Sequence, residues 1–255
     1  MQADIDPLDN IDEDRRDIIN LGTNITGSAT AALAGALVAG PLGAVLGGIA
    51  GPLLTDITQR LISHKEKTRT GALYEYTAHR IKTNLENGMT VRNDDFWNTD
   101  NHAGINEIME GVVIASQREH EEKKLRYYGN LMGNIAFDAS VSRSDGNLLI
   151  RTADGLSYRQ LCLLEISADD NKRNRLRTQA YGGQPLARSL VSTAHELYDL
   201  DRLGLVNAGE FYTDMSVMVP SRLKAEGTGI KLVQLMDLGA IPDEDIEDTI
   251  NVLAI

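Results

Sequence analysis

The clearest hydrophobic pattern in this chain is a long uncharged run near the N-terminus. No charged side chain occurs in residues 18–55, and Asp17 and Asp56 bracket the run. Small residues recur within it at every fourth position: Gly35, Ala39, Gly43, Gly47 and Gly51. Residues four apart share one face of a helix, so these would form a flat stripe that lets another helix approach closely. The pattern predicts a glycine zipper over residues 27–54.

The zipper suits two environments. Pro41 lies near its middle and should kink the segment or divide it into a hairpin of two short helices. The segment exceeds the roughly 20 helical residues that span a bilayer, but its aliphatic side chains supply only about −3 to −5 kcal/mol of insertion free energy. This predicts conditional entry into a membrane. A tightly packed soluble hairpin fits the same pattern, and both interpretations stay open.

Downstream, apolar residues at helical spacing alternate with polar stretches. They predict helices over residues 56–88, 104–138, 156–166, 186–203 and 230–238, and a last one after Pro242. We expect a loop over residues 172–184 and short strands at 205–206 and 212–219. In the second helix, Gly129 and Gly133 would admit a crossing helix, and residues 118–124 would be a solvated charged face.

The predicted fold is mainly α. It has an N-terminal helical region with the zipper hairpin and a C-terminal winged-helix-like region with a short β element. The winged-helix interpretation rests on the succession of helix 186–203, a short β segment and a further helix. We divide the chain into an acidic segment (1–22), a helical region (23–139) and a sensor or regulatory region (140–255).

Charge argues against nucleic acid as a partner. The 255-residue chain has a formal net charge of −12, which repels a phosphate backbone. Helix 186–203 would be the groove reader of a winged helix, but its arginines are accompanied by acidic residues. A DNA reader normally shows a basic face. We therefore expect this region to bind protein, with DNA binding as the lesser alternative.

No constellation for catalysis, metal or cofactor binding stands out. Cys162 is the only cysteine, so an intramolecular disulfide and a thiolate metal cluster are excluded. His195 has Asp199 rather than a second histidine four residues on, so it does not match a zinc helix. We expect no enzyme activity, no metal and no cofactor. Seven acidic residues precede Asn20, the opposite of a secretory signal, so we expect a cytoplasmic location at rest.

Three stretches carry a family resemblance. They are residues 118–138 (REHEEKKLRYYGNLMGNIAFD), 156–161 and 200–206, in this order. Over residues 107–206 the chain resembles bacterial and prophage proteins of the abortive-infection (Abi-alpha-like) group, and also small prophage-encoded pore-forming antiphage proteins. The resemblance implies membrane damage, triggered by infection, that halts phage spread. It supplies no catalytic residue.

Together these patterns predict a defence effector. On activation the zipper would enter the host inner membrane and oligomerise with other copies into a pore. Dilute monomers assemble slowly, so a multimeric trigger such as a phage structural protein would help by raising their effective concentration. The alternative is a soluble adaptor or regulator whose zipper never leaves the core.

Overall fold

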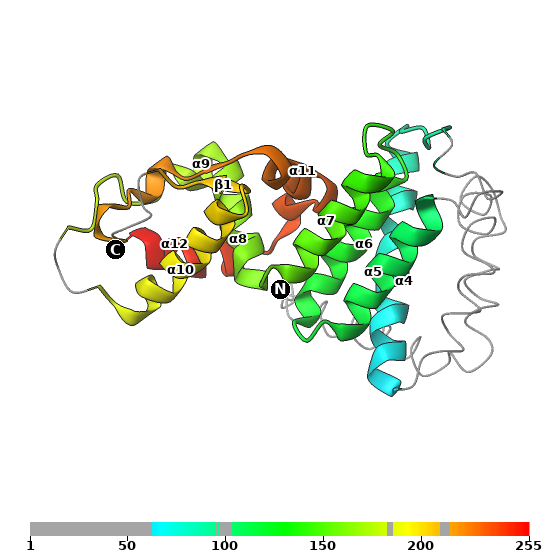
Figure 1. Ribbon diagram of the computed structural model, residues 1–255, viewed down its shortest axis with the longest axis horizontal. Coiled ribbons are helices and arrows are strands. Elements are labelled where there is room, and N and C mark those ends of the chain that lie inside the picture. The colour runs from blue at the N-terminus through cyan, green and yellow to red at the C-terminus, as the bar shows by residue number, and fades with distance from the viewer. Residues whose placement is uncertain (1–62, 95, 97–103, 183–185, 210–214, 255) are drawn as a thin grey trace, which may run out of the picture. The chain divides into compact units, whose positions relative to one another are not determined.

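The computed structural model describes residues 63–94, 96, 104–182, 186–209 and 215–254 (Figure 1). These residues are mainly α-helical, with one two-stranded sheet. The chain divides into two compact units, Met1–Asp154 and Gly155–Ile255. The predicted acidic segment and zipper lie outside the described residues, and so do all the residues singled out there: Gly35, Ala39, Pro41, Gly43, Gly47 and Gly51.

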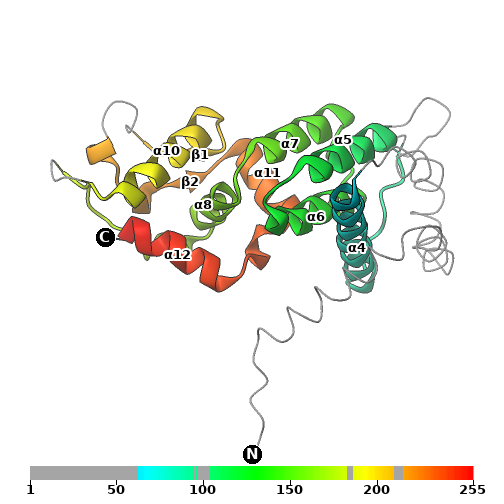
Figure 2. The ribbon, with the colours of Figure 1, turned by 90° about the horizontal axis from the view of Figure 1, so that it is seen from below.

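The first unit contains α4 (His64–Glu86), α5 (Gly104–Arg118), α6 (Leu125–Ile135) and α7 (Arg143–Gly155). In both ribbon views α4 lies against α5 and α6 (Figures 1 and 2). The core is formed by fully buried aliphatic and aromatic side chains: Leu73, Ile81, Ile108, Tyr127, Tyr128, Leu131 and Ile135. The division made from sequence, after residue 139, falls ahead of α7, which packs through Gly111 and Gly146 against α5.

Local sequence sets both ends of α4. Ser63 and Glu66 form a capping box, in which each side chain accepts a hydrogen bond from the other residue's backbone N–H. The helix ends at Asn87, and Gly88 follows with φ of 77°, a conformation that favours glycine. The predicted stop at Gly88 is confirmed. Residues 56–62, the start of the predicted helix, lie outside the described part of the chain.

The single helix expected over residues 104–138 is wrong. The chain forms α5, a break, a 3₁₀ turn η3 (Glu122–Lys124) and then α6. The break occurs because Glu119 and Lys124 turn into the protein and pair there, with relative exposures of only 6% and 2%. The prediction of a wholly solvated charged face at 118–124 is therefore also wrong, although His120, Glu122 and Lys123 are exposed.

Helix α7 was not anticipated. Ser142 and Asp145 bond reciprocally at its start: the Asp145 N–H donates to the Ser142 Oγ, and the Ser142 N–H donates to the Asp145 carboxylate. The spacing Ser-x-x-Asp is itself a start signal that the sequence displays. One face of the helix then buries Leu149, Ile150 and Ala153.

The second unit is built around one buried helix, α8 (Tyr158–Ala168). The short α9 (Asp170–Arg173) follows it, and α10 (Arg188–Arg202), α11 (Gly227–Met236) and α12 (Asp243–Ala254) pack around it. The helix predicted over residues 156–166 begins with a capping box of Ser157 and Gln160, a Ser-x-x-Gln spacing that the sequence displays. The end of α10 before Gly204 and the start of α12 after Pro242 also agree with the sequence.

The β element is a small antiparallel pair, β1 (Val206–Asn207) with β2 (Lys224–Ala225). The strand predicted over 212–219 is wrong for the described residues of that range. Met215–Val217 form the 3₁₀ turn η4, and Pro220–Arg222 form η5. This apolar stretch is anchored by local packing, with Met218 buried, rather than by a strand ladder. Helix α11 starts at Gly227, before the predicted residue 230, and a third 3₁₀ turn, η6 (Leu238–Ala240), follows it.

The stretch 172–184, predicted as a loop, is held by specific contacts wherever it is described. Leu176 is buried, and the Tyr181 hydroxyl donates to the Leu253 carbonyl over 2.9 Å. The Arg175 guanidinium pairs with both carboxylate oxygens of Glu247 on α12. The loop prediction holds for most of the described residues after Arg173, where α9 ends, and Arg175 and Tyr181 tie this loop to α12.

Candidate functional site: the α4–α6 interface

Two glycines of α6 let α4 approach very closely. A Cβ atom at Gly129 would lie 2.4 Å from the Tyr76 Cβ, and one at Gly133 would lie 2.7 Å from the Arg80 Cγ. Real Cβ atoms do not come so near, so only glycine fits these positions without a shift of α4. The order of the contacts shows that the two helices run parallel. The sequence-based prediction that Gly129 and Gly133 admit a crossing helix is confirmed.

Amide side chains continue this interface toward the C-terminal end of α4. The Asn84 Nδ2 donates to the Asn134 Oδ1 over 2.8 Å, and the Arg80 Nε donates to the Asn130 Oδ1 over 3.3 Å. Asn84 and Asn130 are buried. Glycine approach combined with amide pairing resembles the packing of helices in membranes more than an ordinary aliphatic core.

Toward its other end, α4 buries polar atoms that have no hydrogen-bond partner. They are the Arg69 Nε, the Thr70 Oγ1 and the Tyr74 hydroxyl. Burial raises the pKa of the Tyr74 hydroxyl far above its usual value, which keeps it neutral. Arg69 still donates through Nη1 to the Gln117 carbonyl at the end of α5. A buried polar atom without a hydrogen bond costs free energy, so this half of the interface contributes less stability for the area it buries.

Arg92 fixes the chain just beyond α4. Its guanidinium donates to the carbonyls of Ile135, Asp138 and Val141, and its Nε and Nη2 donate to Asp94. The Phe96 ring lies 3.9 Å below the guanidinium carbon. Arg92 is only 7% exposed, whereas residues 87–90, between it and α4, are all exposed. The connection is thus anchored at Arg92 and open at Gly88.

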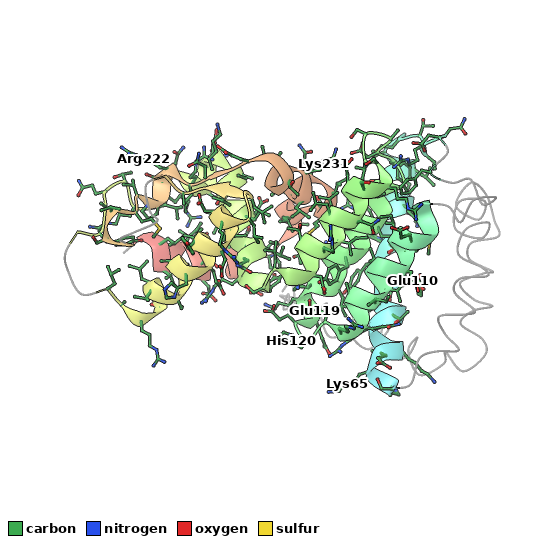
Figure 3. The ribbon with its side chains drawn as sticks, viewed as in Figure 1. Lys65, Glu110, Glu119, His120, Arg222 and Lys231 are labelled. Atoms are coloured by element: carbon green, nitrogen blue, oxygen red, sulfur yellow. The ribbon has the colours of Figure 1, made fainter. Side chains whose placement is uncertain are left out.

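A buried ion pair closes the turn between α5 and α6, where Figure 3 labels Glu119 and His120. The Lys124 Nζ lies 2.5 Å from the Glu119 Oε2, and the Tyr128 hydroxyl donates to the same oxygen over 3.1 Å. Burial alone would raise the pKa of Glu119. Lys124, the Glu121 N–H and the Tyr128 hydroxyl favour the carboxylate, and the pKa lies below its usual value. Glu119 and Lys124 thus stay charged and paired, and they stabilise the turn that leads into α6.

The second unit shows a mixed face on α10. Its exposed residues include Arg188, His195, Tyr198 and Arg202, while Arg159 pairs with Glu196 beside them. The connection from β1 to β2 is held to residues 177–182, because Ser221 N–H donates to the Arg177 carbonyl and Gly182 N–H donates to the Ser216 carbonyl. Figure 3 labels Arg222 and Lys231 on this unit. Its basic side chains are scattered among acidic ones and form no continuous stripe.

The remaining candidates from sequence have simple surroundings. Cys162 is buried in α8 and unoxidised, as expected for a small core residue. His195 is exposed, and no cluster of potential metal ligands occurs in the part of the chain that the structure describes. Among the described helices, none has both the length and the apolar character needed to cross a bilayer.

Comparison with known proteins adds no relative: no family model, curated protein or solved structure matches this chain.

Proposed function

We propose that this protein is an antiphage effector of the abortive-infection type. It rests in the cytoplasm, and on activation it inserts residues 27–54 into the host inner membrane, where copies oligomerise into a pore. The observation that carries the proposal is the uncharged run with its four-residue stripe of Gly35, Ala39, Gly43, Gly47 and Gly51. Such a stripe favours close helix–helix packing in lipid.

The described structure supplies support at the end of this run. Helix α4 begins nine residues after Thr55, and its contact with α6 includes glycine approach and polar side chains beside apolar ones. A weakly hydrophobic segment needs to be held at rest and then let go. The polar atoms of this contact can bind water once α4 leaves, which suits an attachment that is released.

The second unit serves as the sensor in this proposal, as a winged-helix-like, protein-binding region. The succession α10, β1, β2, α11 supports it. The exposed face of α10 offers Tyr198 and Arg202, residue types that are enriched at protein interfaces, without the basic stripe of a DNA reader. A phage structural oligomer is the proposed partner, because its repeated surface would gather several copies of the effector.

The test is inducible expression in a bacterial host, with and without phage infection, while a potential-sensitive dye reports the inner membrane. We expect depolarisation in infected cells with the wild-type chain. Gly47→Leu should abolish it, because a bulky side chain on the stripe holds helices apart. Gly48→Leu is the matched control: it adds the same side chain one position off the stripe and should retain activity.

The outcomes separate the alternatives. Full depolarisation by both Gly43→Leu and Gly47→Leu would rule out the stripe as the assembly surface. A potential that stays intact during infection, with protein expressed and folded, would favour the soluble adaptor. Sequencing of phages that escape would identify the trigger. Mutations confined to enzymes of nucleotide metabolism would contradict a structural oligomer, and mutations on one exposed surface of a shell or ring protein would support it.

A further inference from the structure

We infer that the groove on α6 formed at Gly129 and Gly133 accepts α4 from a second copy of this chain, so that α4 is exchanged between copies. The exchange itself follows from the described contacts. Its role in bringing zipper segments together rests on the proposed function.

The chain provides a hinge in the right place. Residues 87–90 are exposed, and Gly88 already has φ of 77°, which gives the backbone a turn that other residues resist. Arg92 then holds the following chain to the C-terminal end of α6 through three carbonyls. Rotation at Gly88 therefore moves α4 as a unit and leaves the anchorage of α5–α7 in place.

The interface holds polar groups as well as apolar ones. Half of the six buried residues of α4 are polar: Thr70, Thr77 and Asn84. Three further buried atoms, including the Thr70 Oγ1, bond to nothing in the closed form and gain water when α4 leaves. Separation of α4 exposes Leu73 and Ile81, and it also lets these polar atoms bind water.

The state in which α4 has left α6 is high in free energy. Without α4, Asn130 and Asn134 lose the side-chain bonds from Arg80 and Asn84, and the notch at Gly129 and Gly133 loses the helix that fills it. The surface is shaped to α4, and every copy carries an α4. Exchange of an identical element between protomers is a low-cost route to oligomers. When it proceeds head to tail, one chain's α4 filling the next chain's groove, several copies become joined.

The experiment mixes two purified full-length variants, Asn84→Cys and Asn134→Cys. The two side chains touch across the interface, so a disulfide between different chains forms only if α4 of one copy packs on α6 of the other. The variants are incubated together at high concentration below their unfolding temperature, oxidised, and analysed by mass spectrometry for the 84–134 peptide pair. Adding Gly133→Ala to the Asn84→Cys chain loosens its own α4 and should raise the yield further.

A matched pair serves as the control. Glu107→Cys and Arg143→Cys replace an ion pair between α5 and α7, outside the α4 contact, and both native side chains are more exposed than those of the test pair. We expect at least tenfold more inter-chain 84–134 product than 107–143 product. The wild-type chain, with its buried Cys162, measures the background. Circular dichroism confirms that each variant is folded.

Equal yields for the two pairs would overturn the exchange. So would hydrogen exchange showing that α4 amides open only together with those of α5 and α6. Neither readout involves a membrane. Exchange without depolarisation would therefore remove the proposed function and keep this inference, and depolarisation without exchange would do the reverse.

Discussion

The two units use their buried helices in opposite ways. In the first, α4 contacts its neighbours through two glycines, two amide-accepting bonds and several hydroxyl groups. In the second, every residue from 160 to 167 of α8 is buried, and four of these eight residues are leucine or isoleucine. A fully buried leucine contributes about 1.5–3 kcal/mol, whereas a hydrogen bond contributes about 0.5–1.5 kcal/mol net. The difference supports the inference that α4 leaves its site more readily than α8 does.

The largest effect should come from the buried ion pair of the first unit. Glu119→Gln leaves Lys124 charged and 2% exposed, without its carboxylate. Breaking a buried pair in this way costs about 3–5 kcal/mol, so urea unfolding should begin in the first unit at much lower concentration. Glu122→Gln, at an exposed position in the same turn, is the control and should change little. A stable Glu119→Gln protein would show that the corner does not support the bundle.

The next effect tests whether α8 is the fixed core of the second unit. Leu164→Ala removes a side chain with no exposed surface and should cost about 2–5 kcal/mol. Because α10, α11 and α12 all pack on α8, the amides of all three should lose protection together in hydrogen exchange. Leu203→Ala, at a side chain 51% exposed, is the matched control. Loss of protection in α8 alone would contradict the comparison.

Overpacking the glycine contact should loosen α4 selectively. Gly129→Ala places a methyl group 2.4 Å from the Tyr76 Cβ, and such strain typically costs about 1–3 kcal/mol. We expect limited proteolysis to cut α4 while the second unit stays intact. Gly155→Ala meets nothing within 4 Å and should be neutral or slightly stabilising. Equal protease resistance of the two variants would mean that α4 tolerates the shift.

A double-mutant cycle measures the amide contact. Asn84→Leu alone removes the donor to Asn134, and Asn134→Leu alone removes the acceptor. Each single change leaves the other amide without this partner, so the double change should cost less than the sum of the two single changes. The expected coupling is about 1 kcal/mol, determined from urea unfolding curves. Additive effects would show that the two side chains do not interact in solution.

The smallest effect concerns pH and a surface pair of the second unit. Hydrogen bonding to Arg175 holds the pKa of Glu247 below its usual value, although desolvation opposes this. A depressed pKa means that the pair stabilises the fold above the ordinary glutamate pKa of about 4.3 and loses this contribution as the pH falls through the folded value. Glu247→Gln should slightly lower the melting temperature at pH 7, and the difference from wild type should vanish in acid. Added salt should shrink it at neutral pH.

Local signals allowed much of the fold to be predicted. Helix ends are set by residues that satisfy backbone groups a few positions away, so the neighbouring sequence is enough to predict them. Examples are Ser157 with Gln160, Gly204, and Pro242 with the acidic residues that follow it. The close helix packing at Gly129 and Gly133 could also be predicted from the sequence, since these glycines are four residues apart in an apolar helix. Helix α7 could have been found from Ser142 and Asp145, which carry the same kind of cap.

The failures all depend on partners distant in sequence or hidden by composition. Glu119 and Lys124 belong to a charged stretch, and nothing local shows that the protein buries them against Tyr128. The basic residues around Arg175 suggested a solvated loop because their acceptors, such as Glu247, lie some seventy positions away. The apolar residues at 215–219 favour a strand in the sequence. In the structure, Met215–Val217 form a 3₁₀ turn and Met218 is buried by packing instead of pairing. The zipper residues lie outside the described part of the chain and remain a prediction.

Arg92 also determines how the first unit bears a mechanical load. A membrane segment that pulls on the chain before Ser63 would strain the α4 contacts one after another, from Arg69 to Asn84. Separating α4 in this way needs little force, because only one contact is loaded at a time. At Arg92 the geometry changes: several hydrogen bonds to α6 and the chain beyond it, and the Phe96 ring, share the tension at once. Under such a load, Arg92 would be the point at which several contacts resist together.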